Sequence, residues 1–139
     1  MSRLRILLSV FLLLALGACA SGGGQQADAL QKAQYAYAVA IRWSDLEGAW
    51  AQIDPVWRAA HPLGEIERAR YAQVQVTRYR PLTSEATADG GSLRLIDIGV
   101  VNRHTQAERS VRYEERWRYD PAAKAWVVTS GLPDFWSGQ

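Results

Sequence analysis

The strictest pattern in this sequence is the alternation of large and charged side chains over residues 110–119. One set of alternate positions holds Val111, Tyr113, Glu115, Trp117 and Tyr119, and the other set holds Arg112, Glu114, Arg116 and Arg118. Successive side chains of a strand point to opposite faces of a sheet, so this period predicts a strand with one buried and one solvated face. The buried face requires a packing partner, and the rest of the chain must supply it.

Further strands are expected on both sides of this segment. Short alternating or apolar runs that suit half-buried strands occur at residues 74–80, 84–88, 93–102 and 126–129. Asp89-Gly90-Gly91-Ser92 predicts one turn, and Asp120-Pro121-Ala122-Ala123 predicts another. Strands joined by such short turns pair with their neighbours in the chain, which predicts an antiparallel meander.

The segment before these strands predicts helices. Residues 27–43 contain neither Gly nor Pro, and Leu30, Ala33, Tyr37 and Ile41 recur at helical spacing. Ser44-Asp45-Leu46-Glu47 has the pattern of a capping box and predicts a second helix, which Asp54-Pro55 either ends or extends by a new turn. Another short helix is expected over residues 65–70. The chain is therefore predicted to be an α+β domain with N-terminal helices packed on one face of a curved antiparallel sheet.

The N-terminus has the layout of a secretory signal. Arg3 and Arg5 precede an uncharged run over residues 6–18, which ends in small residues before the only cysteine, Cys19. This run is shorter than the ~20 residues that a membrane-spanning helix needs. We therefore expect it to direct export rather than to remain as a membrane anchor.

Leu16-Gly17-Ala18-Cys19 resembles the lipobox of bacterial lipoproteins. The resemblance implies cleavage before Cys19 and acylation of its sulfur, which would anchor the protein in a membrane. Ala20 is not the aspartate that the family associates with inner-membrane retention, so the periplasmic face of the outer membrane is expected. The alternative is an ordinary signal peptide with an incidental cysteine.

The predicted domain organisation follows from this boundary. We expect a signal peptide over residues 1–18, a lipidated Cys19 with a flexible tether over residues 19–27, and a single domain over residues 28–139. Removing Arg3 and Arg5 with the signal leaves 14 basic and 14 acidic residues, so the mature chain is neutral. A neutral chain without a basic cluster gives no support to nucleic acid as a partner.

The mature chain resembles the nuclear transport factor two-like superfamily over roughly residues 30–135. The segments that carry the resemblance are the break at Trp43-Ser44-Asp45, the later Asp54-Pro55 and the predicted closing hairpin, residues 114–119 and 125–135. The resemblance implies a cone-shaped domain that encloses a pocket between helices and sheet, in enzymes as well as in binding modules. A cystatin-like arrangement of a helix on a sheet is the alternative fold.

Seven residues are candidates for lining such a pocket. Trp50, Trp57 and Trp117 lie on the predicted inward stripes, although filling the core is the ordinary role of tryptophan. An inward carboxyl in an apolar pocket has a raised pKa and can act as an acid or a base. The candidates for this role are Asp97 and Glu115, with Tyr79 or Tyr113 as hydroxyl partner. The alternative is that each acid is paired with an arginine or held at the rim of the pocket.

No catalytic residue, metal ligand or cofactor site is predicted. His61 and His104 are expected in exposed loops, and Ser130 lacks the setting of a hydrolase nucleophile. We expect a non-catalytic domain that binds a small apolar ligand or an envelope protein. The alternatives are a pocket lyase or isomerase, which requires inward acids near a tyrosine, and a structural subunit of an envelope assembly, which requires an exposed apolar sheet face.

Overall fold

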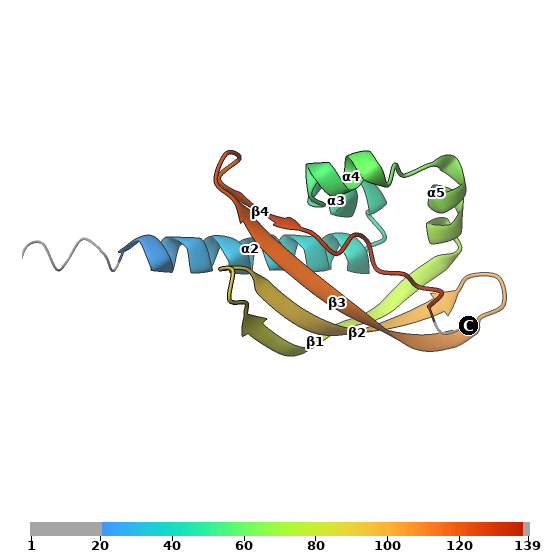
Figure 1. Cartoon of the computed structure of the whole chain (residues 1–139). Coiled ribbons are helices and arrows are strands. Elements are labelled where there is room, and N and C mark those ends of the chain that lie inside the picture. The colour runs from blue at the N-terminus through green and yellow to red at the C-terminus, as the bar shows by residue number, and fades with distance from the viewer. Residues whose placement is uncertain (1–20, 138–139) are drawn as a thin grey trace, which may run out of the picture. The chain divides into compact units, whose positions relative to one another are not determined.

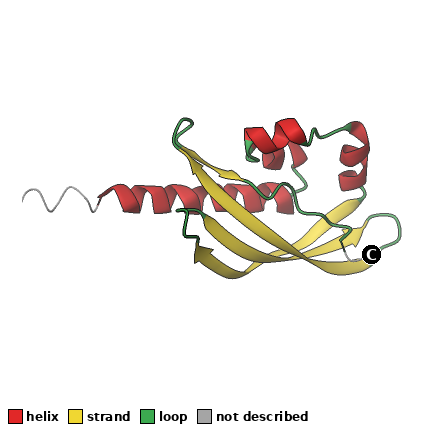
Figure 2. Ribbon diagram, in the orientation of Figure 1, coloured by secondary structure: helices red, strands yellow, loops and turns green. Residues whose placement is uncertain are grey.

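Four helices precede four strands in the part of the chain that the structure describes, residues 21–137 of a computed structural model (Figures 1 and 2). Cys19 and the signal-like segment lie outside these residues. The elements are α2 (Ser21–Arg42), α3 (Leu46–Ala51), α4 (Pro55–Ala60), α5 (Glu65–Ala72), β1 (Val74–Ala86), β2 (Ser92–Asn102), β3 (Glu108–Asp120) and β4 (Ala125–Val128). The predicted α+β arrangement of helices followed by an antiparallel sheet is confirmed.

The strands form one sheet in the order β1-β2-β3-β4, and every neighbouring pair is antiparallel. β1 is continuous, whereas the sequence predicted two separate runs, residues 74–80 and 84–88. The ladder with β2 shifts between Val76 and Arg78 and again between Pro81 and Thr83. Proline is tolerated here because β1 is an edge strand, and bulges of this kind bend a strand without ending it.

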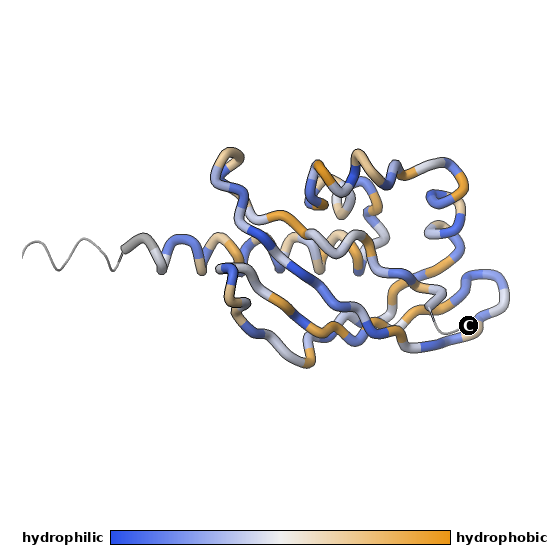
Figure 3. The backbone as a smooth tube through the Cα atoms, in the orientation of Figure 1, coloured by the Kyte–Doolittle hydropathy of each residue, from blue (hydrophilic) through white to orange (hydrophobic). Residues whose placement is uncertain are grey.

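The alternation in β3 is confirmed. Val111, Tyr113, Glu115 and Trp117 are buried, and the residues between them are exposed. The buried side chains face those of β2, where Arg94 lies opposite Glu115 and Ile96 lies opposite Tyr113. Figure 3 shows the resulting contrast between a mostly hydrophilic β3 and a more hydrophobic β2.

Helix α2 begins at Ser21, earlier than the predicted start at Ala27. The prediction of a flexible tether was therefore wrong for residues 21–27, which are helical. Extending an established helix costs less free energy than nucleating one, so the helix continues from its alanine-rich part into the glycines that precede that part. The chain divides into two compact units, Met1–Lys32 and Ala33–Gln139, so the boundary falls within α2. In the second unit α2 buries Tyr37, Ala40 and Ile41 in the core.

The turn after α2 differs in detail from the predicted capping box. Ser44 has a φ of 59° and belongs to the turn, while the N-cap of α3 is Asp45. The Asp45 carboxylate accepts a hydrogen bond of 2.9 Å from the Gly48 N–H. Since an aspartate caps a helix as well as a serine does, the predicted helix forms one residue further along the chain.

Asp54-Pro55 starts a new helix, which confirms one of the two predicted outcomes. The Asp54 carboxylate caps α4 by accepting from the Val56 N–H at 2.9 Å, and Pro55 occupies the first turn. The Asp54 N–H donates to the Val128 carbonyl at 2.8 Å, and Ile53 forms a parallel bridge with Val128. These bonds tie the short helices to the β4 edge of the sheet.

Candidate functional site

A buried cluster of polar side chains surrounds Glu115 on the inner face of the sheet. Glu115 is fully buried. Its Oε1 accepts from Arg94 Nε at 2.8 Å, Arg94 Nη2 at 2.5 Å and Trp117 Nε1 at 2.5 Å, and its Oε2 accepts from the Tyr79 hydroxyl. The donors come from β1, β2 and β3, so the cluster joins three strands through one carboxylate.

Glu115 is paired with an arginine, as the alternative hypothesis for this acid expected. The carboxylate points inward as predicted, but Arg94, Tyr79 and Trp117 all donate to it. Burial, and then the neighbouring carboxylate, raises the pKa of Tyr79 far above its ordinary value. A tyrosine that stays protonated and donates to an ion-paired acid stabilises the core.

A second chain of hydroxyl groups links α2 to the C-terminal segment. The Tyr37 and Tyr113 hydroxyls lie 3.1 Å apart, and Tyr113 donates to the Gly131 carbonyl at 2.6 Å. The Tyr37 ring packs edge-on against Trp117, with ring centroids 5.7 Å apart. Burial is the main cause that raises the pKa of both tyrosines. Tyr113 and Trp117, predicted as pocket residues, therefore belong to the packed core.

Asp97 lies on the opposite face of the sheet, so its prediction as an inward acid was wrong. Ile96 and Ile98 of the same strand are buried in the core, and the alternation of strand side chains places Asp97 on the other face. Its carboxylate accepts from the Ser110 hydroxyl and from Arg78 Nε at 2.9 Å. These two hydrogen bonds lower the pKa of Asp97 instead of raising it.

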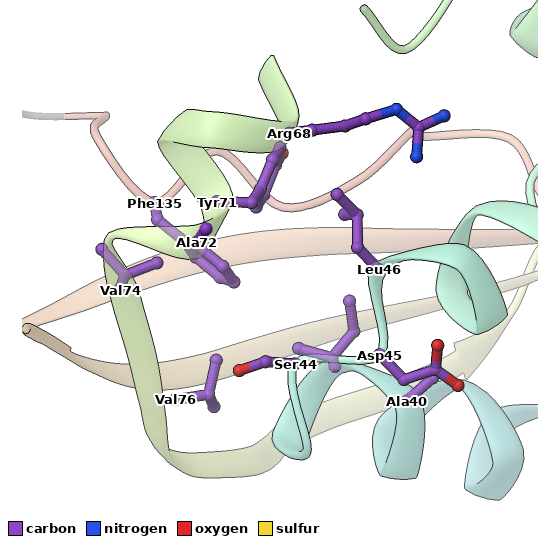
Figure 4. A pocket seen from close by; sticks show the side chains of 11 residues that line it. Ala40, Ser44, Asp45, Leu46, Arg68, Tyr71, Ala72, Val74, Val76 and Phe135 are labelled. Carbon is purple, nitrogen blue, oxygen red and sulfur yellow. The ribbon is translucent and has the colours of Figure 1, made fainter. Parts of the chain in front are cut away.

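An apolar pocket lies between the end of α2, the start of α3, α5 and β1 (Figure 4). Its volume is about 120 Å³. Its lining is mostly apolar and consists of Ala40, Ile41, Ser44, Asp45, Leu46, Arg68, Tyr71, Ala72, Val74, Val76 and Phe135. None of the seven predicted pocket residues contributes to it, because the pocket lies beside α5 rather than between α2 and the centre of the sheet.

A polar link connects the two helices that flank this pocket. Figure 4 shows Arg68 extending from α5 toward the side on which Leu46 lies. Arg68 forms an ion pair with Glu47, the residue after Leu46 in α3. Both side chains of the pair are well exposed, so the pair is weak and holds α3 and α5 together only loosely.

Trp50 and Trp57 line a second, more open hollow of about 300 Å³. Their rings meet nearly at right angles, with centroids 5.8 Å apart, and His61 stacks on Trp57 at 4.2 Å. His61 is exposed, as predicted, but at the end of α4. Of the seven candidates, these two tryptophans are the ones that line a described pocket.

Tyr71 lines the apolar pocket, the tryptophan hollow and a third hollow of about 210 Å³. Its hydroxyl donates to the Pro133 carbonyl at 2.9 Å, and its ring packs against Phe135 and Trp136. Burial raises the pKa of Tyr71 to about 12. Tyr71 thus attaches α5 to the C-terminal segment, together with Arg70, whose guanidinium lies 4.3 Å from the centroid of the Trp136 ring.

Residues 21–137 contain no group of three or more His, Cys, Asp or Glu side chains that could hold a metal ion. None of the helices in the same range is long and apolar enough to cross a membrane. Comparison of the chain with protein-family models, with curated proteins and with solved structures found no match. The class of the fold is therefore defined by its own architecture, short helices and one long helix with an open four-stranded antiparallel sheet.

Proposed function

We propose that this chain is a lipid-anchored envelope protein whose domain binds a partner through an apolar contact and catalyses no reaction. The observation that carries the proposal is the contrast between the buried polar cluster around Glu115 and the apolar pocket beside α5. The polar interior is closed around Glu115, whereas the pocket beside α5 is apolar and open to solvent at its rim. A surface pocket with apolar walls and few polar groups is suited to binding.

The size of the pocket restricts what enters it. Pockets for drug-sized ligands measure ~300–1,000 Å³, and an apolar cavity of ~150 Å³ accommodates benzene. About 120 Å³ therefore suits one ring or one branched aliphatic side chain. Of the two expected partners, this size favours an envelope protein that inserts a single apolar side chain over a larger free molecule.

The anchor in this proposal is Cys19, acylated after cleavage of the signal, with the protein at the periplasmic face of the outer membrane. The lipobox-like residues Leu16-Gly17-Ala18-Cys19 support it. We also propose that the domain is a small variant of the nuclear transport factor two-like fold. The helices before the sheet, the bulged β1 and the closing β3–β4 hairpin support that assignment.

The two alternatives have less support. An isomerase or lyase needs an acid or base that is free to exchange a proton, and both candidate acids are held by arginines. An assembly subunit that docks through its sheet needs an exposed apolar face, and the outward side chains of β3 include Arg112, Glu114 and Arg116.

Fluorobenzene tests the pocket directly, because it approximates one apolar ring. We expect saturable binding to the purified full chain in fluorine NMR. Ala72→Phe should abolish it, since Ala72 lines the pocket and its larger side chain fills the space. Ala69→Phe is the matched control, because Ala69 is an exposed alanine of the same helix outside the pocket lining. Equal binding by both variants, or none by the parent chain, would refute the pocket.

The anchor is tested separately by cell fractionation. We expect Cys19→Ser to leave the membrane fraction, because a serine has no thiol to acylate. Retention of the variant in the membrane would refute lipidation without affecting the pocket.

A further inference from the structure

Three arginines gather around one carboxylate on the face of the sheet opposite the buried cluster. Arg80 of β1 and Arg112 of β3 lie directly opposite Asp97 of β2 in the two ladders, and Arg78 lies two residues before Arg80 in β1. Their side chains are 43%, 64% and 59% exposed for Arg78, Arg80 and Arg112, whereas that of Asp97 is 5% exposed. The guanidinium groups thus cover the acid and face solvent themselves.

The carboxylate fixes the positions of these arginines. Asp97 Oδ2 accepts from Arg78 Nε at 2.9 Å and from Arg80 Nη2 at 3.4 Å, while Oδ1 lies 3.4 Å from Arg112 Nη1. Ser110 donates to Asp97 and accepts from Arg78 Nη2 at 3.2 Å. Because a guanidinium has five N–H donors, each arginine keeps donors that these bonds do not use.

The charge of the cluster is unbalanced. One carboxylate faces three guanidinium groups, which leaves a surplus of two positive charges. Glu114, the next acid on the same face of β3, does not offset it, because it pairs with Arg116 at 2.9 Å. Like charges held this close attract a multivalent anion more strongly than a single arginine does.

We propose that Arg78, Arg80 and Arg112 form a binding site for a phosphate group, with Asp97 and Ser110 as positioning residues. The planar guanidinium fork matches phosphate oxygens and binds them through two parallel hydrogen bonds. A phosphate monoester carries about −1.5 to −2 charges near neutral pH, which matches the surplus of the cluster. A free phosphorylated molecule offers this group as a monoester, and the headgroup of an anionic phospholipid offers the same phosphate oxygens as a diester with about one negative charge.

The site is tested by NMR of the arginine Nε–H groups in the full chain, purified in a non-ionic detergent. One arm adds inorganic pyrophosphate, and the other adds phosphatidylglycerol to the detergent micelles. We expect saturable shifts at Arg78, Arg80 and Arg112 in at least one arm. A response to pyrophosphate identifies a site for free phosphate groups, and a response to the lipid alone identifies a headgroup site. No saturable shift in either arm would overturn the proposal.

A matched pair of variants separates a site from general attraction. R80Q/R112Q should weaken binding by about tenfold or more, because it removes charge-assisted hydrogen bonds to the anion. R42Q/K124Q removes the same number of charges from exposed basic residues outside the cluster and should change affinity by less than about twofold. Equal losses in the two variants would overturn the proposal. If R80Q/R112Q does not fold, the NMR shifts of the parent chain alone test the proposal. Shifts that are spread evenly over all arginines, rather than confined to Arg78, Arg80 and Arg112, would overturn the proposal.

Discussion

Replacing Glu115 by glutamine tests whether the buried cluster stabilises the core. Glutamine keeps the shape of the side chain but removes the negative charge that balances Arg94. The Arg94 side chain is only 11% exposed, so its charge would remain largely buried without a counter-charge. Breaking one side of a buried ion pair costs about 3–5 kcal/mol of folding free energy. We expect Glu115→Gln to lower the free energy of unfolding by about this amount in urea titration.

The same structure predicts which further substitutions recover the loss. Replacing Arg94 by methionine and Glu115 by leucine removes both charges but leaves the Tyr79 hydroxyl and the Trp117 N–H without their acceptor. Adding Tyr79→Phe removes one of these two donors. The triple variant should then lose only about 1–3 kcal/mol, the cost of one unsatisfied buried donor.

Two outcomes would refute this reasoning. A loss below about 1 kcal/mol for Glu115→Gln would mean that the Arg94 charge is solvated and that the cluster is not closed. A triple variant no more stable than Glu115→Gln would mean that the charge imbalance is not the source of the cost. Arg116→Gln is the control, since its ion pair with Glu114 is exposed and should contribute less than about 1 kcal/mol.

Three further predictions concern the core, a glycine and the loss of stability at acid pH. Trp117→Ala should lower the free energy of unfolding by about 3–5 kcal/mol, and a change below about 1 kcal/mol would contradict its buried position. Gly131→Ala should cost more than Gly90→Ala in the same assay. Both glycines have positive φ, but a Cβ at Gly131 would overlap the Trp57 ring, whereas one at Gly90 meets no atom within 4 Å. Equal costs would exclude this contact. The hydroxyl and guanidinium groups that hold Asp97 lower its pKa, so its contribution to stability is present above the ordinary carboxyl pKa and lost as the pH falls through the lowered one. Asp97→Asn should therefore reduce the fall in the free energy of unfolding at acid pH. An unchanged dependence of stability on pH would contradict the lowered pKa of Asp97.

The fold was predictable where the sequence repeats with a clear period. β3 alternates charged and large residues from Val111 to Tyr119, so its buried face follows from the sequence. The extents of α2 and β1 were not predictable in this way. The glycines in the first turn of α2 and Pro81 in β1 have poor local propensity, and the continuation of each element past them depends on the element as a whole.

The site was predictable only in part. Tyr79, Tyr113, Glu115 and Trp117 meet in the interior as their strand positions indicate, but whether that interior is a pocket or a packed cluster depends on Arg94. This arginine lies at an inward position of β2 and carries no signal in the sequence that distinguishes it from a surface arginine.

The pocket beside α5 could not be predicted, because its lining comes from segments that no short-range pattern relates. Leu46 belongs to a short helix, Val76 to a strand and Phe135 to an irregular C-terminal segment. Only the tertiary path of residues 129–136 brings Phe135 against Tyr71. Tyr71 itself stands at the end of a helix whose other residues are charged or exposed, and nothing in that helix indicates that it would line a pocket.

In the proposed function, the residues that stabilise the domain and the residues that bind a partner lie in different parts of it. The polar cluster around Glu115 joins three strands, whereas α5 buries none of its residues. α5 is attached by Tyr71, by the Arg70 guanidinium over the Trp136 ring and by the exposed Arg68–Glu47 ion pair. An element with so few buried contacts moves at a low free-energy cost. If the proposed function holds, a side chain that enters the pocket beside α5 should shift this helix without disturbing the sheet, because the ion-paired cluster around Glu115 holds three strands together.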